Sequence, residues 1–368
     1  MDKISTASIK RLRELDFLRG LAIILVLFQH IPFSKFTSTI GWIGVDLFFV
    51  LSGFLISGLL FREYQKFGNI NPWLFLVRRA FKIYPIYYLF MLPYLGIKIF
   101  YFHRFYLLGF IYDSTFVQNY FLGWGYACPA SWSLAVEEHF YFGFSILLWI
   151  VANKLNLDIR KSAFYIVIIT ILFIVFGIRY ASNALHFFDV TRLYTATHLR
   201  IDSLFMGVLI SYFYYFKNDL LIKLYHKNKR LLKLIMLAGL AWTPFFVVKE
   251  SFFANTFGFS LLYISFGILL LIFILEQSIN QTLDKFFSKQ FVSIVSNIGL
   301  ASFSIYYIHS FFIFLYDLIK IKYSIFSDNI ISCSIIFLVS ILSGILMTSY
   351  IEKYFLKIRD KYFPSRVI

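Results

Sequence analysis

The stretch FLRGLAIILVLFQHIPF, residues Phe17–Phe33, places one arginine and one histidine in an otherwise apolar run. Arg19 and His30 are eleven residues apart, which is three helical turns plus about 20°. Both side chains therefore lie on one face of the predicted helix, roughly 16 Å apart along its axis. A face with ionisable groups at two depths could line a passage that connects the two sides of a membrane.

The composition around this stretch is that of a membrane protein. Of the 368 residues, 60% are hydrophobic and only 15% are charged. Apolar segments of about 20 residues indicate transmembrane helices. The sequence therefore predicts an all-α integral membrane protein with about ten transmembrane helices. The predicted segments are residues 15–33, 43–61, 79–101, 133–152, 163–181, 198–216, 231–248, 258–276, 292–317 and 330–352.

The excess of Lys and Arg is concentrated on one side of the predicted membrane domain. The net charge is +16, and a cytoplasmic N-terminus would place 25 Lys and Arg on the cytoplasmic side against 8 on the opposite side. The positive-inside rule therefore predicts that both termini are cytoplasmic, and it explains most of the charge without a nucleic-acid partner. We expect a cytoplasmic segment 1–14, one transmembrane domain 15–352 and a short basic cytoplasmic tail 353–368. No cleavable signal peptide is expected.

Ionisable groups at membrane depth are candidates for function because their burial is costly. Four predicted helices place such groups near their outer ends, and the alternative for each group is a solvated helix end or a packed pair. A neutral histidine such as His30 suits a general base, and Glu137 could orient its ring and stabilise the imidazolium. The outer groups are His30, Glu137, Glu138, His139, His198, Arg200, Asp202 and His309, with Asp46 at the outer start of the second helix.

The cytoplasmic entry of the third predicted helix carries three cations, Arg78, Arg79 and Lys82, just before Pro85. Three cations beside a proline kink suit a polyphosphate or nucleotide ligand, although for this stretch alone ordinary positive-inside anchoring is the better explanation. The two cysteines, Cys128 and Cys333, have no metal-ligand spacing. The longest predicted non-helical stretch is 102–132, on the outer side, and it could dip back into the protein.

Six motifs in chain order resemble the acyltransferase-3 family of integral membrane acyltransferases, of the polysaccharide O-acetyltransferase type without a fused SGNH domain. Lys82 stands where the family usually has arginine, and His139 stands where it often has glutamine. The motifs are the pair Arg19 and His30, GVDLFFVLSGFLI at Gly44–Ile56, RRAFKIYPIY at Arg78–Tyr87, WSLAVEEHFY at Trp132–Tyr141, Arg200 with Asp202 and Gly207, and Ser302, Ser304, Tyr306 with His309.

The resemblance implies transfer of an acetyl group from cytoplasmic acetyl-CoA to an extracytoplasmic hydroxyl, with no metal. His30 would be catalytic, as general base or transient acyl carrier, and Glu137 would partner it or position the acceptor. Arg19, Arg78, Arg79 and Lys82 would bind the CoA phosphates or line the passage to them. The residues expected to bind the acceptor are Asp46, Trp132, Ser133, Arg200, Asp202 and His309.

We therefore expect an O-acetyltransferase of the bacterial inner membrane whose partners are acetyl-CoA, a saccharide and membrane lipids. Lipopolysaccharide O-antigen or its lipid-linked precursor is the favoured acceptor. One alternative is a transporter or flippase for a lipid-linked saccharide, because intramembrane His, Glu and Arg are equally natural there. Another alternative is an acyltransferase that acts on a small molecule or on peptidoglycan. With few residues after the last predicted helix, the membrane domain itself is expected to deliver the acyl group.

Overall fold

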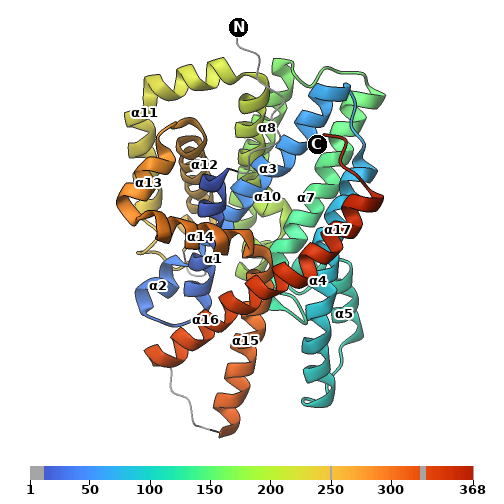
Figure 1. Cartoon of the computed structure of the whole chain (residues 1–368), viewed down its shortest axis with the longest axis vertical. Helices are drawn as coiled ribbons and strands as arrows, with labels where there is room; N and C mark the ends of the chain where they lie inside the picture. The colour runs from blue at the N-terminus through green and yellow to red at the C-terminus, as the bar shows by residue number, and fades with distance from the viewer. Residues whose placement is uncertain (1–11, 249–250, 324–328, 368) are drawn as a thin grey trace.

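The structure is a computed structural model that describes residues 12–248, 251–323 and 329–367, and these residues form helices joined by loops, with no strand among them (Figure 1). This confirms the predicted all-α class. The main helices are α1 (Arg13–His30), α2 (Lys35–Ile40), α3 (Ile43–Phe67), α4 (Pro72–Phe100), α5 (Leu107–Ser114), α6 (Gln118–Phe121), α7 (Trp132–Trp149), α8 (Ser162–Ala184), α9 (Val190–Thr195), α10 (Thr197–Phe216), α11 (Asn218–Ala241), α12 (Phe259–Leu275), α13 (Ile279–Phe287), α14 (Lys289–Leu300), α15 (Ser302–Tyr323), α16 (Ile330–Met347) and α17 (Lys353–Tyr362).

Seven helical segments of the described chain are long and apolar enough to cross a membrane. The predicted segments 15–33, 198–216 and 231–248 have no counterpart among these seven. The corresponding helices are α1, α10 and α11, and charged side chains lower their hydropathy. Helix α1, for example, carries Arg13, Glu14, Asp16 and Arg19. The seven segments are Lys35–Phe67, Pro72–Phe100, Pro129–Lys154, Ser162–Ala184, Ala254–Leu275, Ser302–Lys320 and Ile330–Tyr362.

Helix α3 is largely buried and packs against α1, α7, α10 and α12. Its approach to α10 is the closest that backbones allow, because a Cβ on Gly53 would lie 2.0 Å from the carbonyl oxygen of Leu204. A Cβ on Gly207 would likewise lie 2.2 Å from the carbonyl oxygen of Val50. Small residues permit this contact, as expected for packed membrane helices.

The predicted single helix 292–317 is wrong, because the chain breaks at Ala301 into α14 and α15. Helix α14 packs tightly on α1, where a Cβ on Gly299 would lie 1.9 Å from the carbonyl oxygen of Asp16. Hydropathy is similar on both sides of Ala301, so it gives no sign of the turn. The break frees α15 to run in its own direction, with Ser302 at its start beside Arg19.

The predicted non-helical stretch 102–132 is partly helical, because it contains α5, α6 and a 3₁₀ turn at Pro129–Ser131. Asp113 at the end of α5 is buried, and its carboxylate accepts hydrogen bonds from the backbone N–H groups of Tyr126 (2.9 Å) and Ala127 (2.6 Å). Burial raises the pKa of Asp113 to about 6. These bonds hold the segment in place, with Trp124 and Tyr126 facing a cavity described below.

The C-terminal helices cross the bundle as one nearly continuous arm, seen as the orange-to-red diagonal in Figure 1. A π-helical turn, Thr348–Glu352, joins α16 to α17, so the helical segment extends beyond the predicted end at residue 352. Ion pairs then tie this arm to the first part of the chain. They are Arg78–Asp360 (3.0 Å), Lys82–Glu352 (3.8 Å) and Arg366–Glu63 (2.5 Å).

Candidate active site

Two adjoining cavities lie inside the helix bundle. The smaller, of about 140 Å³, is lined by Arg19, Arg79, Lys82 and Glu137, and we call it the cationic cavity. The larger, of about 840 Å³, is lined by His30, and we call it the histidine cavity. Val45 and Tyr306 line both, so these two side chains stand between the cavities. Arg19 and His30, which lie on one face of α1, therefore line different cavities.

The cationic cavity brings together side chains from α1, α4 and α7. The Arg19 guanidinium donates a hydrogen bond to Ser302 Oγ (3.1 Å), and Lys82 Nζ lies 3.8 Å from a Glu352 carboxylate oxygen. Among the described residues, the Arg79 guanidinium forms no hydrogen bond or ion pair, and it lies 5.7 Å from the Phe75 ring. Three cations against the one carboxylate of Glu137 leave the lining net positive, which attracts anions.

Arg78 behaves differently from its neighbour Arg79. One nitrogen lies 3.0 Å from Asp360, and another donates to the backbone carbonyl of Phe363. In the described part of the chain, Arg78 is absent from the lining of both cavities. Of the four cations expected to bind the donor, the structure therefore brings Arg19, Arg79 and Lys82 together and turns Arg78 toward α17.

In the histidine cavity, His30 is exposed to the open space and its Nδ1 lies 2.9 Å from the carbonyl oxygen of Val26. A carbonyl oxygen only accepts, so Nδ1 carries the proton and Nε2 has the free lone pair. The ring of His309 lies 5.1 Å from that of His30, and His309 is fully buried. The helices that carry His30 and His309 therefore bring the two rings together, and His30 keeps a basic nitrogen.

Aromatic side chains form much of the remaining wall of the histidine cavity. They come from α4, α7, α9 and α15, from the turn between α2 and α3, from the 102–132 segment and from the loop after α11. Lys35, Lys98 and Asp317 add charge between them. Such a mixture of apolar rings and a few polar groups is typical of ligand cavities. The aromatic residues are Trp42, Tyr94, Trp124, Tyr126, Trp132, Tyr194, Phe246, Tyr306 and Phe314.

Glu137 and His30, expected to act as a pair, line different cavities. A Glu137 carboxylate oxygen accepts a hydrogen bond from Tyr141 Oη (3.0 Å), and that hydroxyl lies 2.8 Å from Ser52 Oγ. Ser133, expected at the acceptor, lines the cationic cavity instead, while Trp132 lines the histidine cavity. Ser52 and Tyr141 are lining residues that the sequence reasoning did not select as site residues.

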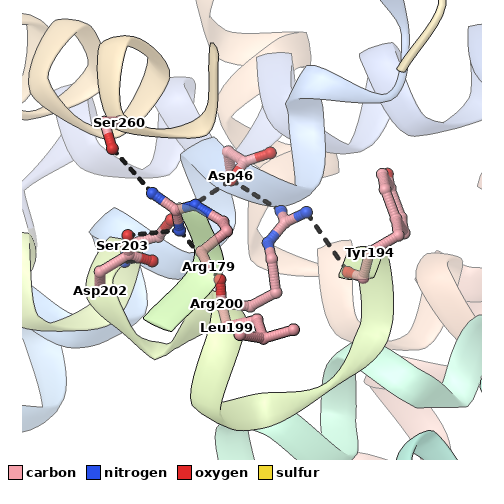
Figure 2. A network of polar contacts seen from close by, with 8 residues as sticks. All are labelled: Asp46, Arg179, Tyr194, Leu199, Arg200, Asp202, Ser203 and Ser260. Atoms are coloured by element: carbon pink, nitrogen blue, oxygen red, sulfur yellow. Dashed lines mark hydrogen bonds and ion pairs between the residues drawn. The ribbon is translucent and has the colours of Figure 1, made fainter. Parts of the chain in front are cut away.

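Three residues expected to bind substrate lie in a fully buried polar network instead (Figure 2). Arg200 Nη2 contacts Asp46 Oδ1 at 2.8 Å, and Arg179 Nη1 contacts Asp202 Oδ2 at 2.6 Å. Ser203 Oγ donates to Asp46 and Arg179 Nη2 donates to Ser260, so the network joins α3, α8, α10 and α12. In the described structure, none of these side chains lines either cavity.

Arg179 is the member of this network that the sequence analysis missed. It stands near the end of the predicted segment 163–181, in an otherwise apolar helix. A single arginine at such a position was itself the available signal, because an intramembrane cation needs a partner. The described residues contain no group of three or more His, Cys, Asp or Glu side chains that could hold a metal ion.

The described part of the chain is helical, with seven candidate membrane spans, an anion-attracting cavity and a basic histidine beside it. These features define the class of polytopic membrane proteins with internal polar sites. Comparison with known proteins gives the family. Residues 12–349 match the family model described as "Acyltransferase domain", and the chain belongs to this family. The resemblance seen in the six motifs is thereby confirmed.

Among curated relatives, the peptidoglycan O-acetyltransferase OatA of Listeria monocytogenes is 33% identical over 179 residues, which are 43% of this chain and 28% of the relative. The O-acetyltransferase OatA of Staphylococcus aureus is 26% identical over 212 residues, 54% of this chain and 34% of the relative. The chain therefore spans about a third of the length of the relatives it matches. No solved structure matches the chain.

Proposed function

We propose that this chain is a multi-pass O-acetyltransferase of the bacterial inner membrane. It moves an acetyl group from cytoplasmic acetyl-CoA to a hydroxyl of an extracytoplasmic polysaccharide, with O-antigen or its lipid-linked precursor as the favoured acceptor. The observation that carries the proposal is the pair of cavities that meet at Val45 and Tyr306. One attracts anions, and the other presents a basic histidine.

The topology proposed for this reaction has ten spans, with α1, α10 and α11 added to the seven apolar segments, and both termini in the cytoplasm. The distribution of Lys and Arg between the two sides supports it. In this orientation the start of α4, with Arg79 and Lys82, lies toward the cytoplasm. His30, at the other end of α1 from Arg13, lies toward the outside. The donor and acceptor then approach from opposite sides.

The proposed chemistry follows from the tautomer of His30. Its Nε2 accepts the proton of the acceptor hydroxyl while the hydroxyl oxygen forms a bond to the acyl carbon. The bond between that carbon and the sulfur of CoA breaks, and the leaving thiolate takes the proton from the imidazolium. Arg19, Arg79 and Lys82 would meanwhile hold the phosphates of the donor by charge-assisted hydrogen bonds. Removing a general base of this kind costs about 10²–10⁴ in rate.

A second acceptor has support of its own. A relative that matches 43% of this chain is named a peptidoglycan O-acetyltransferase, so peptidoglycan is the alternative acceptor for the same reaction. A transporter is less well supported, because three of the buried charges that suggested it, Asp46, Arg200 and Asp202, are paired with arginine or aspartate inside the protein.

The experiment that tests the proposal is mass spectrometry of surface polysaccharide and of peptidoglycan from cells with the wild-type chain, with His30→Ala, or with neither. We expect an added acetyl mass on one glycan that depends on the chain and falls at least about 100-fold in His30→Ala. His226→Ala is the matched control, because His226 is exposed on α11, away from both cavities. Normal acetylation in His30→Ala, or no acetylation of either glycan, would refute the proposal.

A further inference from the structure

Tyr306 of α15 lines both the cationic cavity and the histidine cavity, and we call it, with Val45, the wall between the two cavities. Tyr306 is buried. Val45 of α3 is the second residue that faces both spaces. These two side chains therefore lie where the cavity of Arg19, Arg79 and Lys82 meets the cavity of His30.

Hydrogen bonds hold the Tyr306 ring in this position. Its hydroxyl donates to the carbonyl oxygen of Ala130 (3.0 Å), because that carbonyl can only accept. Ser133 Oγ, 2.7 Å away, then donates to the Tyr306 oxygen. The side chain therefore extends from α15 and is fastened at its far end to the start of α7. The neighbouring tyrosine, Tyr307, has a buried hydroxyl without a hydrogen-bond partner in the described structure.

The wall is next to the histidines and is packed against other rings. The Tyr306 ring lies 5.7 Å from the His309 ring, which in turn lies 5.1 Å from the His30 ring. On its other side, the Phe48 ring meets Tyr306 edge-on at 6.4 Å. Val45 is β-branched, which limits its side chain to few rotamers. Closely packed interiors do not readily accept extra methylene groups, so the space between these side chains has a definite size.

We propose that Tyr306, together with Val45, is a specificity-determining element that restricts the transferred acyl group to a short chain. This inference rests on the proposed acyltransferase function. An acetyl group presents one methyl to the wall, whereas a butyryl group presents two further methylenes. A pocket distinguishes substrates that differ by one methylene about 10- to 200-fold. The wild-type chain should therefore use acetyl-CoA much better than butyryl-CoA, and a smaller wall should reduce the difference.

The test uses the full chain in lipid nanodiscs, with acetyl-CoA or butyryl-CoA as donor and the glycan fraction that the wild-type chain acetylates in cells as acceptor. The measured quantity is kcat/KM for butyryl-CoA divided by that for acetyl-CoA, from the acylated glycan and the released CoA thiol. We expect this ratio to rise at least about tenfold in Val45→Ala and further in Tyr306→Ala. Tyr306→Phe, which keeps the ring and loses the hydroxyl anchor, should lie between the wild type and Tyr306→Ala.

Leu134→Ala is the matched control, because Leu134 lines the cationic cavity and is not among the residues that line the histidine cavity. Its ratio should stay within about twofold of the wild type. An equal rise in Leu134→Ala would overturn the inference, since volume rather than the wall would then set the chain length. Val45→Ala is a small change, so it keeps the test decisive if Tyr306→Ala fails to fold.

The role of the wall and the proposed acyltransferase function can be disproved separately. If the wild-type chain transfers acetyl but the wall variants keep its ratio, Tyr306 and Val45 do not set acyl length and the proposed function stands. If the wild-type chain transfers no acyl group from either donor to the glycan, the proposed function is wrong and the inference falls with it.

Discussion

The buried network of Asp46, Arg200, Arg179 and Asp202 and the lining of the cationic cavity use the same kinds of side chain in opposite ways. In the network each arginine has a carboxylate within 2.8 Å, and all four side chains are fully buried (Figure 2). In the cavity Arg79 has no carboxylate partner among the described residues, and three cations face one Glu137. Charges paired within the protein hold helices together, whereas Arg79, which faces a cavity without forming an ion pair in the described structure, can contact a ligand.

The difference between paired and cavity-facing charges can be tested first by removing one partner of a buried pair. Arg200→Ala should destabilise the folded protein by about 3–5 kcal/mol, because Asp46 would be left buried without its countercharge. This is a large part of the usual stability of a folded domain. The measurement is thermal unfolding in detergent, together with the yield of monodisperse protein. Asp46→Leu combined with Arg200→Met should cost less than Arg200→Ala alone, and an equal or larger cost would contradict the reasoning.

The second test removes Arg79, the cavity cation that forms no ion pair in the described structure. Arg79→Ala should leave folding unchanged and raise the apparent KM for acetyl-CoA about 10- to 100-fold, the size of a lost charge-assisted hydrogen bond. Arg78→Ala is a matched control from the adjacent position, because Arg78 already contacts Asp360 and Phe363. Its effect on KM should be clearly smaller. Equal effects of the two substitutions would show that the cavity does not distinguish them.

Glu137→Gln tests the charge of the cationic cavity in the opposite direction. It removes the negative charge from an anion-binding cavity, so the apparent KM for acetyl-CoA should fall by about two- to tenfold, opposite to Arg79→Ala. Because Glu137 and His30 line different cavities, the pH dependence of kcat should stay where the wild type has it. Steady-state kinetics across a pH series measures both quantities. A shifted pH profile would restore Glu137 as the partner of His30.

The smallest effect is expected at an exposed ion pair between α7 and α8. Arg160 contacts Asp158 at 2.9 Å and lowers the pKa of that carboxyl to about 2. Because this pKa lies below the ordinary value, the pair stabilises the protein above about pH 4 and its contribution is lost as the pH falls toward 2. Exposed pairs often contribute nothing measurable, so Arg160→Ala should barely change Tm near pH 7. A Tm loss comparable to that of Arg200→Ala would invalidate the distinction between buried and exposed pairs.

Hydropathy predicted the all-helical membrane class and most of the apolar helices, because lipid exposure selects for apolar side chains along a whole helix. It could not find the break at Ala301, which depends on how Gly299 packs against the backbone of Asp16. It also gave no sign that residues 353–362 continue as a helix along α4, since charged side chains there pair with Arg78 rather than with water alone.

The sequence analysis grouped Glu137 with the outer histidines, whereas in the structure it lines the same cavity as Arg19, Arg79 and Lys82. Arg19, Arg79, Lys82 and Glu137 do meet in one cavity, and His30 does meet His309. The sequence could not separate these from Asp46, Arg200 and Asp202, because position along a helix fixes the depth of a side chain while tertiary packing fixes what it faces. The same limit hid the difference between Arg78 and Arg79.

The arm formed by α16 and α17 has a consequence for biosynthesis. A chain is made from its N-terminus, and the contact between Arg78 and Phe363 joins residues 285 positions apart. Helix α4 is therefore synthesised and inserted long before Asp360 and Glu352 exist to pair with Arg78 and Lys82. The cations at the start of α4 are left without these carboxylates until the arm arrives. Pairing of Lys82, which lines the cationic cavity, with Glu352 is thus one of the last events of assembly, and a chain stopped before the arm lacks this ion pair.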